Sequence, residues 1–280
     1  MTETLERPRL CSIALATFNG SRFLREQLDS LLGQSYGNLE IVVSDDQSAD
    51  DTPRILNEYS AADPRIRWSP NPAPRGYAKN FERAISGCRG DFIFLCDQDD
   101  VWSSDKVRQH VLAYDDPKIA WVYNRVELID ENGRRIGTLE DAAPDYYGEK
   151  TITQAAWGSC ILGCATSYRA EAVKWTLPIG RHARAHDSWI QLLLHARPHV
   201  FLDVQLQFYR MHEANSAGWN QPEGPEHQRQ MHDGYVRLLR ELSQNPKIPV
   251  DRRLFFFGLY LKKALLRQIR QRGRRANQDL

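Results

Sequence analysis

Residues 92–100 read FIFLCDQDD, an apolar run that ends in three carboxylates within four positions. The apolar part is typical of a buried strand. Unpaired negative charges are very costly to bury, so we expect the carboxylates at the open end of this strand, where they can share a cation. Oxygen ligands without a neighbouring cluster of Cys and His favour Mg²⁺ or Mn²⁺ over Zn²⁺. The alternative is an acidic loop that caps the helix starting near Ser103, since Asp is also a good N-cap residue.

The composition fits a folded protein with a sizeable core. The chain has 280 residues, of which 41% are hydrophobic and 26% are charged, and its net charge is +1. These values argue against a disordered chain. They allow one large α/β domain, alone or with a helical appendage. A net charge near zero gives no whole-protein reason to expect a nucleic-acid partner.

The cysteines and the N-terminus bear on where the protein works. Five cysteines, an odd number, fit a reducing compartment. The segment Met1–Arg9 is polar and has no apolar region of a secretory leader. No stretch of the sequence reaches the ~18 apolar residues needed to span a bilayer. We therefore expect a cytoplasmic protein, either soluble or peripheral at the inner face of the cytoplasmic membrane.

Apolar runs and amphipathic stretches alternate over the first 117 residues. This pattern favours strands joined by helices, with right-handed crossovers and a parallel sheet covered on both faces. The predicted strands lie at 10–17, 39–44, 66–68 and 91–96. Ligands of such sheets bind beyond the carboxyl ends of the strands. Five polar residues at these ends should therefore meet: Thr17, Asp45, Asp46, Asp97 and Asp99.

The pattern changes after about residue 117. It predicts a hairpin at 119–137, a mobile polar loop at 141–149, and strands at 159–168 and 200–211. Helices are predicted at 170–176, 187–194, 228–242 and 252–272, with a linker that bears Gly and Pro at 218–226.

Seven short motifs occur in an order and spacing that resemble the family 2 glycosyltransferases. They are Ala16 to Asn19, Val43 to Ser48, Asn71 to Asn80, Asp97 to Asp100, Gly163-Cys164, His186 to Trp189 and Tyr209 to His212. The resemblance covers about residues 9–216. The run Cys96 to Trp102 is similar to bacterial rhamnosyltransferases that build O-antigen and related polysaccharides.

The resemblance implies an α/β fold of the GT-A type and inversion at the anomeric carbon. The expected architecture is a mostly parallel, Rossmann-like sheet with flanking helices, a small antiparallel sheet on the acceptor side and a C-terminal helical extension. The expected glycosyltransferase domain covers 1–217, with a nucleotide-binding half at 9–117 and an acceptor and catalytic half at 118–217. A basic helical extension covers 218–280.

The resemblance also implies a site for a nucleotide-sugar donor. The backbone of Ala16 and the ring of Phe18 would hold the base, with Thr17 alongside. Asp46, or as a second choice Asp45, would contact the base. Phe18 stands where the family more commonly has Tyr, so a hydroxyl contact is lost there.

A divalent cation, Mg²⁺ or Mn²⁺, is expected beside the donor diphosphate. By the resemblance, Asp99 is its direct ligand, Asp97 reaches the ribose or the metal shell, and His212 matches a position that completes the shell in some relatives. A lone His is, however, more often structural. The cation would absorb negative charge on the departing diphosphate, with Arg75 or Lys79 as supplements.

Asp187 matches the catalytic base of the family. It begins an apolar helix, so local physics alone favours an N-cap. As a base it would take the proton of the acceptor hydroxyl, and a positioned general base typically contributes ~10²–10⁴-fold in rate. The two roles are compatible, since one carboxylate oxygen can accept a backbone N–H.

The expected reaction is transfer of a single sugar, because the Gln-x-x-Arg-Trp signature of processive relatives is absent. The favoured donor is dTDP-L-rhamnose and the favoured acceptor a glycan or lipid-linked glycan; UDP-hexose and UDP-N-acetylhexosamine donors stay open. A sugar nucleotidyltransferase would usually need a Gly-rich phosphate loop after the first strand, where this chain has Phe18-Asn19-Gly20. A non-catalytic nucleotide-sugar binder is disfavoured by the retained carboxylates.

The C-terminal stretch 252–275 is strongly basic and carries nine Lys or Arg residues. Four apolar residues recur in it at helical spacing: Leu254, Phe257, Leu261 and Leu265. A cationic amphipathic helix can lie in a membrane interface, which would suit a lipid-linked acceptor. The alternative is a helix that packs on the main domain or on a second subunit. We therefore expect 250–275 to contact either a membrane or protein.

Overall fold

The computed structural model describes residues 9–72, 76–152, 154, 161–183, 185–213 and 225–276. Arg75, the start of the strand predicted at 159–168 and most of the linker predicted at 218–226 lie outside these ranges.

Four parallel strands form the N-terminal half of the sheet, in the order β3-β2-β1-β4. They are β1 (Cys11–Thr17), β2 (Leu39–Asp45), β3 (Ile66–Pro70) and β4 (Phe92–Cys96). All four were predicted from the apolar runs. In register, Thr17 lies opposite Asp45, so the carboxyl ends of β1 and β2 share one edge.

The C-terminal half continues the same sheet. It adds β5 (Val101–Trp102), β6 (Trp121–Ile129), β7 (Arg135–Thr138), β8 (Thr166–Arg169) and β9 (His199–Arg210). Antiparallel pairing is present, as predicted, but among the described residues these strands join one nine-stranded sheet instead of forming a separate small one. The reason is that β8 pairs with both β4 and β6, which bridges the two halves.

The strand predicted at 159–168 is shorter than expected. A 3₁₀ turn at Gly163–Ala165 precedes β8, which begins only at Thr166. The turn is held by Thr166, whose hydroxyl donates to the Gly163 carbonyl at 2.6 Å. A side chain that satisfies the local backbone competes with strand pairing, and it moves the start of the strand.

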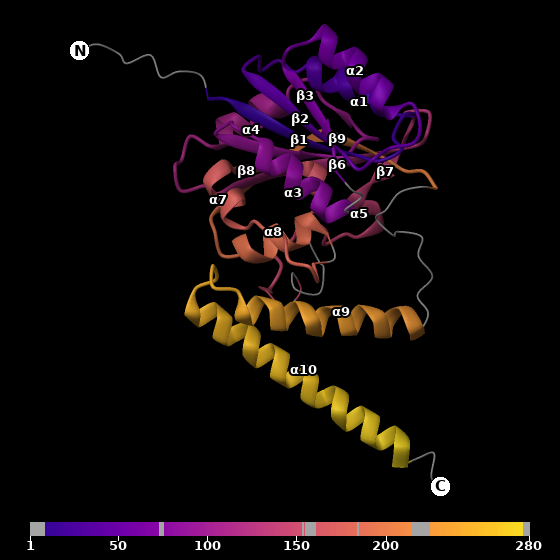
Figure 1. The fold of residues 1–280 in the computed structure, drawn as a ribbon. Helices are drawn as coiled ribbons and strands as arrows, with labels where there is room; N and C mark the ends of the chain where they lie inside the picture. The colour runs from indigo at the N-terminus through magenta and orange to yellow at the C-terminus, as the bar shows by residue number, and fades with distance from the viewer. Residues whose placement is uncertain are drawn as a thin grey trace, which may run out of the picture.

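Helices cover both faces of the sheet (Figure 1). On one face lie α1 (Leu24–Leu32), α2 (Thr52–Ala62) and α4 (Lys106–Ala113), and on the other lie α3 (Tyr77–Gly87), α7 (Ala170–Trp175) and α8 (His186–Leu194). The strands supply both cores because successive side chains alternate between faces. Ile13 and Leu15 thus join the α1 side, and Ala14 and Ala16 join the α3 side.

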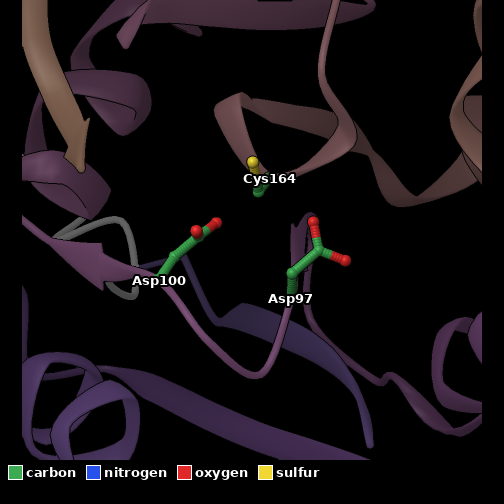
Figure 2. A group of neighbouring side chains, drawn as sticks. All are labelled: Asp97, Asp100 and Cys164. Atoms are coloured by element: carbon green, nitrogen blue, oxygen red, sulfur yellow. The ribbon is translucent and has the colours of Figure 1, made fainter. Parts of the chain in front are cut away.

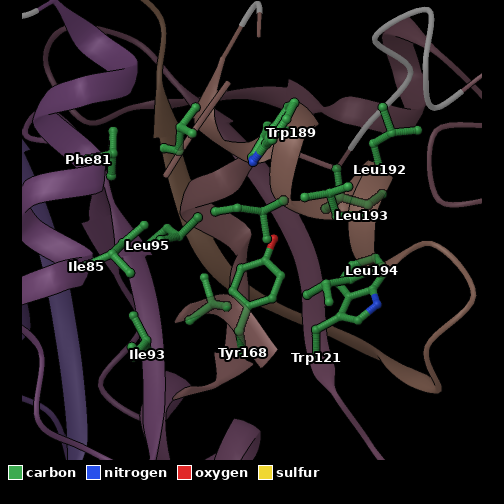
Figure 3. Close-up of a cluster of buried hydrophobic side chains, with 14 of the residues drawn as sticks. Phe81, Ile85, Ile93, Leu95, Trp121, Tyr168, Trp189, Leu192, Leu193 and Leu194 are labelled. Carbon is green, nitrogen blue, oxygen red and sulfur yellow. The ribbon is translucent and has the colours of Figure 1, made fainter. Parts of the chain in front are cut away.

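The larger core lies between the sheet and helices α3 and α8 (Figure 3). Phe81 and Ile85 of α3 and Trp189 of α8 are almost completely buried there. The indole N–H of Trp189 donates to the Thr176 carbonyl at 2.8 Å, so its polar atom is satisfied inside the core. This packing fixes the first turn of α8, which carries Asp187.

The polar segment 141–149 was predicted to be a mobile loop; the structure shows turns there after the end of a short helix, and its mobility stays a prediction. A short helix, α5 (Leu139–Ala142), starts with a capping box between Thr138 and Asp141. The hydroxyl of Tyr146 accepts from the Leu162 N–H at 2.8 Å, and that of Tyr147 accepts from the Val126 N–H at 2.7 Å. The two tyrosines anchor the segment, because their rings pack on the core and their hydroxyls satisfy buried backbone donors.

Two long helices follow: α9 (Pro225–Gln244) and α10 (Val250–Ala276). Leu239 and Leu242 of α9 and Phe256 of α10 are buried in the core that α8 shares. The predicted helical extension is therefore present, and it packs on the α/β body (Figure 1). Within the described part of the chain, no helix is long and apolar enough to cross a membrane.

Candidate functional site

Two neighbouring aspartates lie at the end of β2 and accept hydrogen bonds from different partners. Asp45 accepts from the hydroxyls of Thr17 at 2.8 Å and Ser48 at 2.6 Å, and from the Ser48 backbone N–H at 2.9 Å. It is buried and its oxygens hold the turn together. Asp46 accepts from the Asn71 amide at 2.8 Å and from the Gly76 N–H at 2.9 Å. Asp46 thus ties the end of β2 to the start of α3.

Two asparagines complete this edge, and the sequence argument gave neither a role. The Asn71 amide also donates to the Asn80 side-chain oxygen at 3.0 Å, and the Asn80 amide donates to the Thr17 carbonyl at 3.0 Å. Both side chains are buried. One feature of the sequence could have indicated this role: the two asparagines stand at the two ends of the motif Asn71 to Asn80. A buried amide at such a position can form hydrogen bonds to two loops at once.

Phe18 and Gln98 join the loops that follow β1 and β4. The Phe18 ring is 55% exposed. Its backbone N–H donates to the Gln98 side-chain oxygen at 2.8 Å, and its carbonyl accepts from the Gln98 amide at 3.1 Å. A Cβ at Gly20 would lie 2.2 Å from that oxygen, so a larger residue there would displace the Gln98 amide. Gln98 was not predicted as a site residue, although it lies between Asp97 and Asp99.

Asp97, Asp100 and Cys164 form an acidic cluster beyond β4, with potential ligand atoms within 4.8 Å of one another (Figure 2). The two oxygens of Asp100 already accept from the Gln207 amide at 2.7 Å and the Arg210 N–H at 3.0 Å. Burial raises the pKa of the Cys164 thiol well above its usual value, which keeps the sulfur protonated. A hard divalent cation selects carboxylate oxygens, so Asp97 is the member of this cluster that fits one.

Asp99 lies beside His212. The Nε2 atom of His212 is 3.0 Å from a carboxylate oxygen of Asp99, and both side chains are largely buried. The Arg210 guanidinium donates to the Asp99 backbone carbonyl at 2.9 Å, which positions the loop. Burial, followed by the charges of Asp99 and Asp187, raises the pKa of Asp97 to about 7. A bound divalent cation would favour the ionised form of this buried carboxyl.

Asp187 lies in the first turn of α8, and the N-cap position is Ala185. Its carboxylate accepts from the Gly163 N–H at 3.1 Å and the Ser188 N–H at 2.6 Å. Asp187 is close enough to Asp97 to affect the pKa of that carboxyl. The site therefore brings together a carboxylate from β4 and one from α8.

Tyr77 at the start of α3 and His186 were not predicted as site residues. The Tyr77 hydroxyl donates to Asp97 at 3.3 Å, and its ring meets the His186 ring edge-on at 5.1 Å. His186 also stacks on Phe81 at 3.6 Å. Burial lowers the pKa of His186 to about 4, so the ring is neutral. Through these contacts, Tyr77 and His186 connect Asp97 with the first turn of α8.

Lys79 is engaged by structural partners. Its ammonium group donates to Glu82 at 2.6 Å and to the Ile179 carbonyl at 2.7 Å. The other cation expected near the diphosphate, Arg75, lies outside the described residues. We therefore leave Lys79 out of the donor site that we propose below.

A buried lysine, Lys106, forms hydrogen bonds to residues that contact the acidic cluster. The ammonium group of Lys106 donates to the Gln207 side-chain oxygen at 2.6 Å and to the Cys164 carbonyl, and it lies 3.6 Å from the Trp102 ring centroid. Gln207 in turn donates to Asp100. Burial lowers the pKa of Lys106 to about 8. Lys106, Gln207 and Asp100 thus form one hydrogen-bonded chain under the site.

The α/β sheet thus carries carboxylates at the ends of its parallel strands, and helix α8 adds a further carboxylate, Asp187. The family model described as Glycosyl transferase family 2 matches residues 12–175. The chain belongs to this family. The family expected from its motifs is confirmed.

Two relatives from Escherichia coli illustrate the sequence similarity. Chondroitin synthase is 34% identical over 134 residues, which cover 48% of this chain and 19% of that protein. The UDP-Glc:alpha-D-GlcNAc-diphosphoundecaprenol beta-1,3-glucosyltransferase WfgD is 31% identical over 157 residues, which cover 56% of this chain and 58% of that protein. The chain thus matches less than two thirds of the length of either relative.

Solved structures of similar fold are known. The S. aureus TarS fragment 1–349 in complex with UDP-GlcNAc superposes with a TM-score of 0.64 at 18% identity, over 91% of this chain and 72% of that one. The mannosyltransferase PcManGT from Pyrobaculum calidifontis, in complex with GDP-Man and Mn²⁺, gives a TM-score of 0.59 at 18% identity, over 91% of this chain and 70% of that one. These similarities confirm the GT-A-type fold.

Proposed function

We propose that this chain transfers a single sugar, with inversion, from a nucleoside diphosphate to a hydroxyl of a glycan or lipid-linked glycan. The observation that carries the proposal is the cluster beyond β4, where Asp97 lies beside Cys164 and the N–H of the neighbouring Gly163 donates to Asp187. In the proposed reaction the acceptor oxygen bonds to the anomeric carbon as the bond from that carbon to the diphosphate breaks. The acceptor proton passes to Asp187, because a nearby carboxylate is the natural general base for a hydroxyl.

The divisions expected from the sequence fit this proposal. Residues 9–117 would hold the donor, and 118–217 would supply Asp187 and the acceptor surface. Ala16 and Thr17 end β1 beside Asp46, and Phe18 offers an exposed ring, so a base could lie against this edge. The extension 218–280 would be an addition to the catalytic domain, although α9 shares its core.

Asp97, Asp99 and His212 would hold Mg²⁺ or Mn²⁺. This cation supplies positive charge that stabilises the departing diphosphate. The carboxylate oxygens suit a hard cation, and the 3.0 Å contact between His212 and Asp99 places an imidazole beside them.

His212 gives a direct test of the metal assignment. If it ligates the cation, His212→Ala should weaken Mn²⁺ binding ~10-fold or more, since loss of a ligand or its support typically costs that much. Calorimetric titration of Mn²⁺ measures this. His199→Ala removes an exposed histidine elsewhere and should bind Mn²⁺ like wild type. Unchanged affinity in His212→Ala would reject the assignment.

The donor is proposed to be a UDP-linked hexose or N-acetylhexosamine, with dTDP-L-rhamnose as the competing candidate. The relative WfgD is named for UDP-Glc and for a diphosphoundecaprenol acceptor. A Bacillus subtilis relative, 24% identical over 186 residues, is named as a putative teichuronic acid biosynthesis glycosyltransferase. These names support a bacterial polysaccharide acceptor, and a UDP-sugar more than a rhamnose donor; a role in O-antigen synthesis stays a prediction.

Binding of UDP-Glc, UDP-GlcNAc, dTDP-L-rhamnose and GDP-mannose in the presence of Mn²⁺ tests the donor. We expect a UDP-sugar to bind at least ~10-fold more tightly than the others, a difference of about 1.4 kcal/mol. Tighter binding of dTDP-L-rhamnose would overturn the UDP proposal. Failure of all four to bind would sink the transferase proposal itself.

Gln98 is expected to position the base-binding loop. Gln98→Leu keeps the size of the side chain and removes both hydrogen bonds to Phe18, each worth about 0.5–1.5 kcal/mol. The donor KM should therefore rise ~5–100-fold, with a smaller change in kcat, because the loop that holds the base is released. Steady-state kinetics measure the split. Gln244→Leu, at an exposed position, is the matched control. A kcat loss at unchanged KM would contradict the positioning role.

A further inference from the structure

Helix α10 carries an apolar stripe that the fold leaves uncovered. Leu254, Phe257 and Leu261 are 64%, 46% and 49% exposed. They follow one another at intervals of three and four residues, so they lie on one side of the helix. Val250, 60% exposed, continues this stripe toward the N-terminus of α10. We call these four residues the α10 stripe.

The opposite side of α10 already has its partner. Phe256 is buried in the main core, and Tyr260 packs against that core while partly exposed. The Arg252 guanidinium donates to the Leu193 carbonyl at 3.4 Å. The helix is thus fixed on the α/β body by one side, and the α10 stripe is a second apolar surface that internal packing does not use.

The charge around the stripe is one-sided. The helix 250–276 contains nine Lys and Arg residues and a single acidic residue, Asp251. Seven of the basic residues lie at or after Lys262. Because the whole chain has a net charge of +1, the remainder carries an excess of negative charge. In Figure 1 the basic C-terminal part of α10 extends away from this body.

We propose that α10 docks on an anionic membrane surface, with the α10 stripe in the interface and the basic C-terminal part against acidic headgroups. Apolar burial and electrostatic attraction act together in such helices, and clustered Lys and Arg residues are attracted to anionic lipid. The negative remainder of the chain would be repelled, which orients the protein with α10 toward the membrane. Pairing of α10 with α10 of a second copy would place two strongly basic helices side by side. Charge complementarity therefore favours the lipid surface.

Flotation of the full chain with vesicles tests this proposal without any need for turnover. Phosphatidylcholine vesicles are compared with vesicles that also contain phosphatidylglycerol. We expect at least ~10-fold more protein to float with the anionic vesicles at low salt. Binding should fall when salt rises from ~0.1 M to ~1 M, because the Debye length shrinks from ~10 Å to ~3 Å.

Two triple variants separate the apolar and charged contributions. The apolar variant carries Leu254→Ser, Phe257→Ser and Leu261→Ser, and its control carries Leu112→Ser, Ile136→Ser and Val204→Ser at exposed positions off α10. The charge variant carries Lys262→Glu, Arg267→Glu and Arg270→Glu, and its control carries Arg89→Glu, Lys118→Glu and Arg134→Glu. Each α10 variant should lose ~10-fold or more of the bound fraction, and each control should float like wild type.

Some outcomes would overturn the proposal. Equal flotation with both vesicle types, or full binding by the apolar variant, would show that the stripe does not dock on lipid. A dimer in light scattering that the apolar variant abolishes, without flotation of the wild type, would assign the stripe to a second copy. Unchanged donor-induced thermal stabilisation in both α10 variants confirms that they fold, so loss of flotation then reports on docking alone.

Discussion

Asp187→Asn is expected to slow sugar transfer ~10²–10⁴-fold, the usual contribution of a positioned general base. The amide keeps the shape of the side chain and one acceptor oxygen, but it cannot take the proton of the acceptor hydroxyl. Donor affinity should change little, because Asp187 accepts from the backbone of Gly163 and Ser188 and is not among the proposed ligands of the cation or the donor. Steady-state kinetics and calorimetric donor binding measure these effects.

A matched substitution separates the loss of the proposed base from the loss of one negative charge. Asp115→Asn removes the same charge at an exposed position and should leave kcat unchanged. A kcat for Asp187→Asn within about threefold of wild type would remove Asp187 from the role of base. Loss of donor binding in parallel with kcat would instead make it a residue that organises the site.

Lys106→Ala should destabilise the fold by ~3–5 kcal/mol, the usual cost of removing one partner from a buried charged network. The ammonium group holds Gln207 and the Cys164 carbonyl, and Gln207 holds Asp100. Its loss leaves buried acceptors unpaired and a void against Trp102. Because Asp100 accepts from the Arg210 backbone, the disturbance should also reach the loop that carries Asp99. Urea unfolding measures the free energy.

Two further variants show which interactions account for the stability lost in Lys106→Ala. Lys118→Ala, an exposed lysine, should change the free energy of unfolding by less than ~0.5 kcal/mol. Lys106→Met restores most of the volume without the donors, so it should recover only the packing part of the loss. If Lys106→Ala unfolds like wild type, the chain from Lys106 to Asp100 is not needed for stability.

Much of the fold could be predicted because its signals are local. Near-continuous apolar runs gave β1, β2 and β4, and the stretches between them gave the helices. The contacts of the segment 141–149 could not be predicted, because Leu162 and Val126, the partners of Tyr146 and Tyr147, lie elsewhere in the chain. The predicted strand at 159–168 is wrong in its bounds, because a local turn at Gly163 takes the place of strand pairing there.

The residue types of the site could be predicted from the sequence, but the contacts and the role of each residue could not. The order of strands alone placed the carboxylates of Asp45, Asp46, Asp97 and Asp99 at one edge, because parallel strands end together. Only the tertiary structure shows that Asp45 and Asp100 are occupied by internal hydrogen bonds and that Lys79 is held by Glu82.

The sequence by itself determined the sheet, the family and the acidic edge, since these follow from chain order and from patterns within a few residues. The tertiary structure decided which side chains remain available there. Asp100 is bonded to Gln207 and Arg210, 107 and 110 residues away, and His212 meets Asp99 across 113. Contacts of that separation depend on how distant segments pack, and no local pattern encodes them.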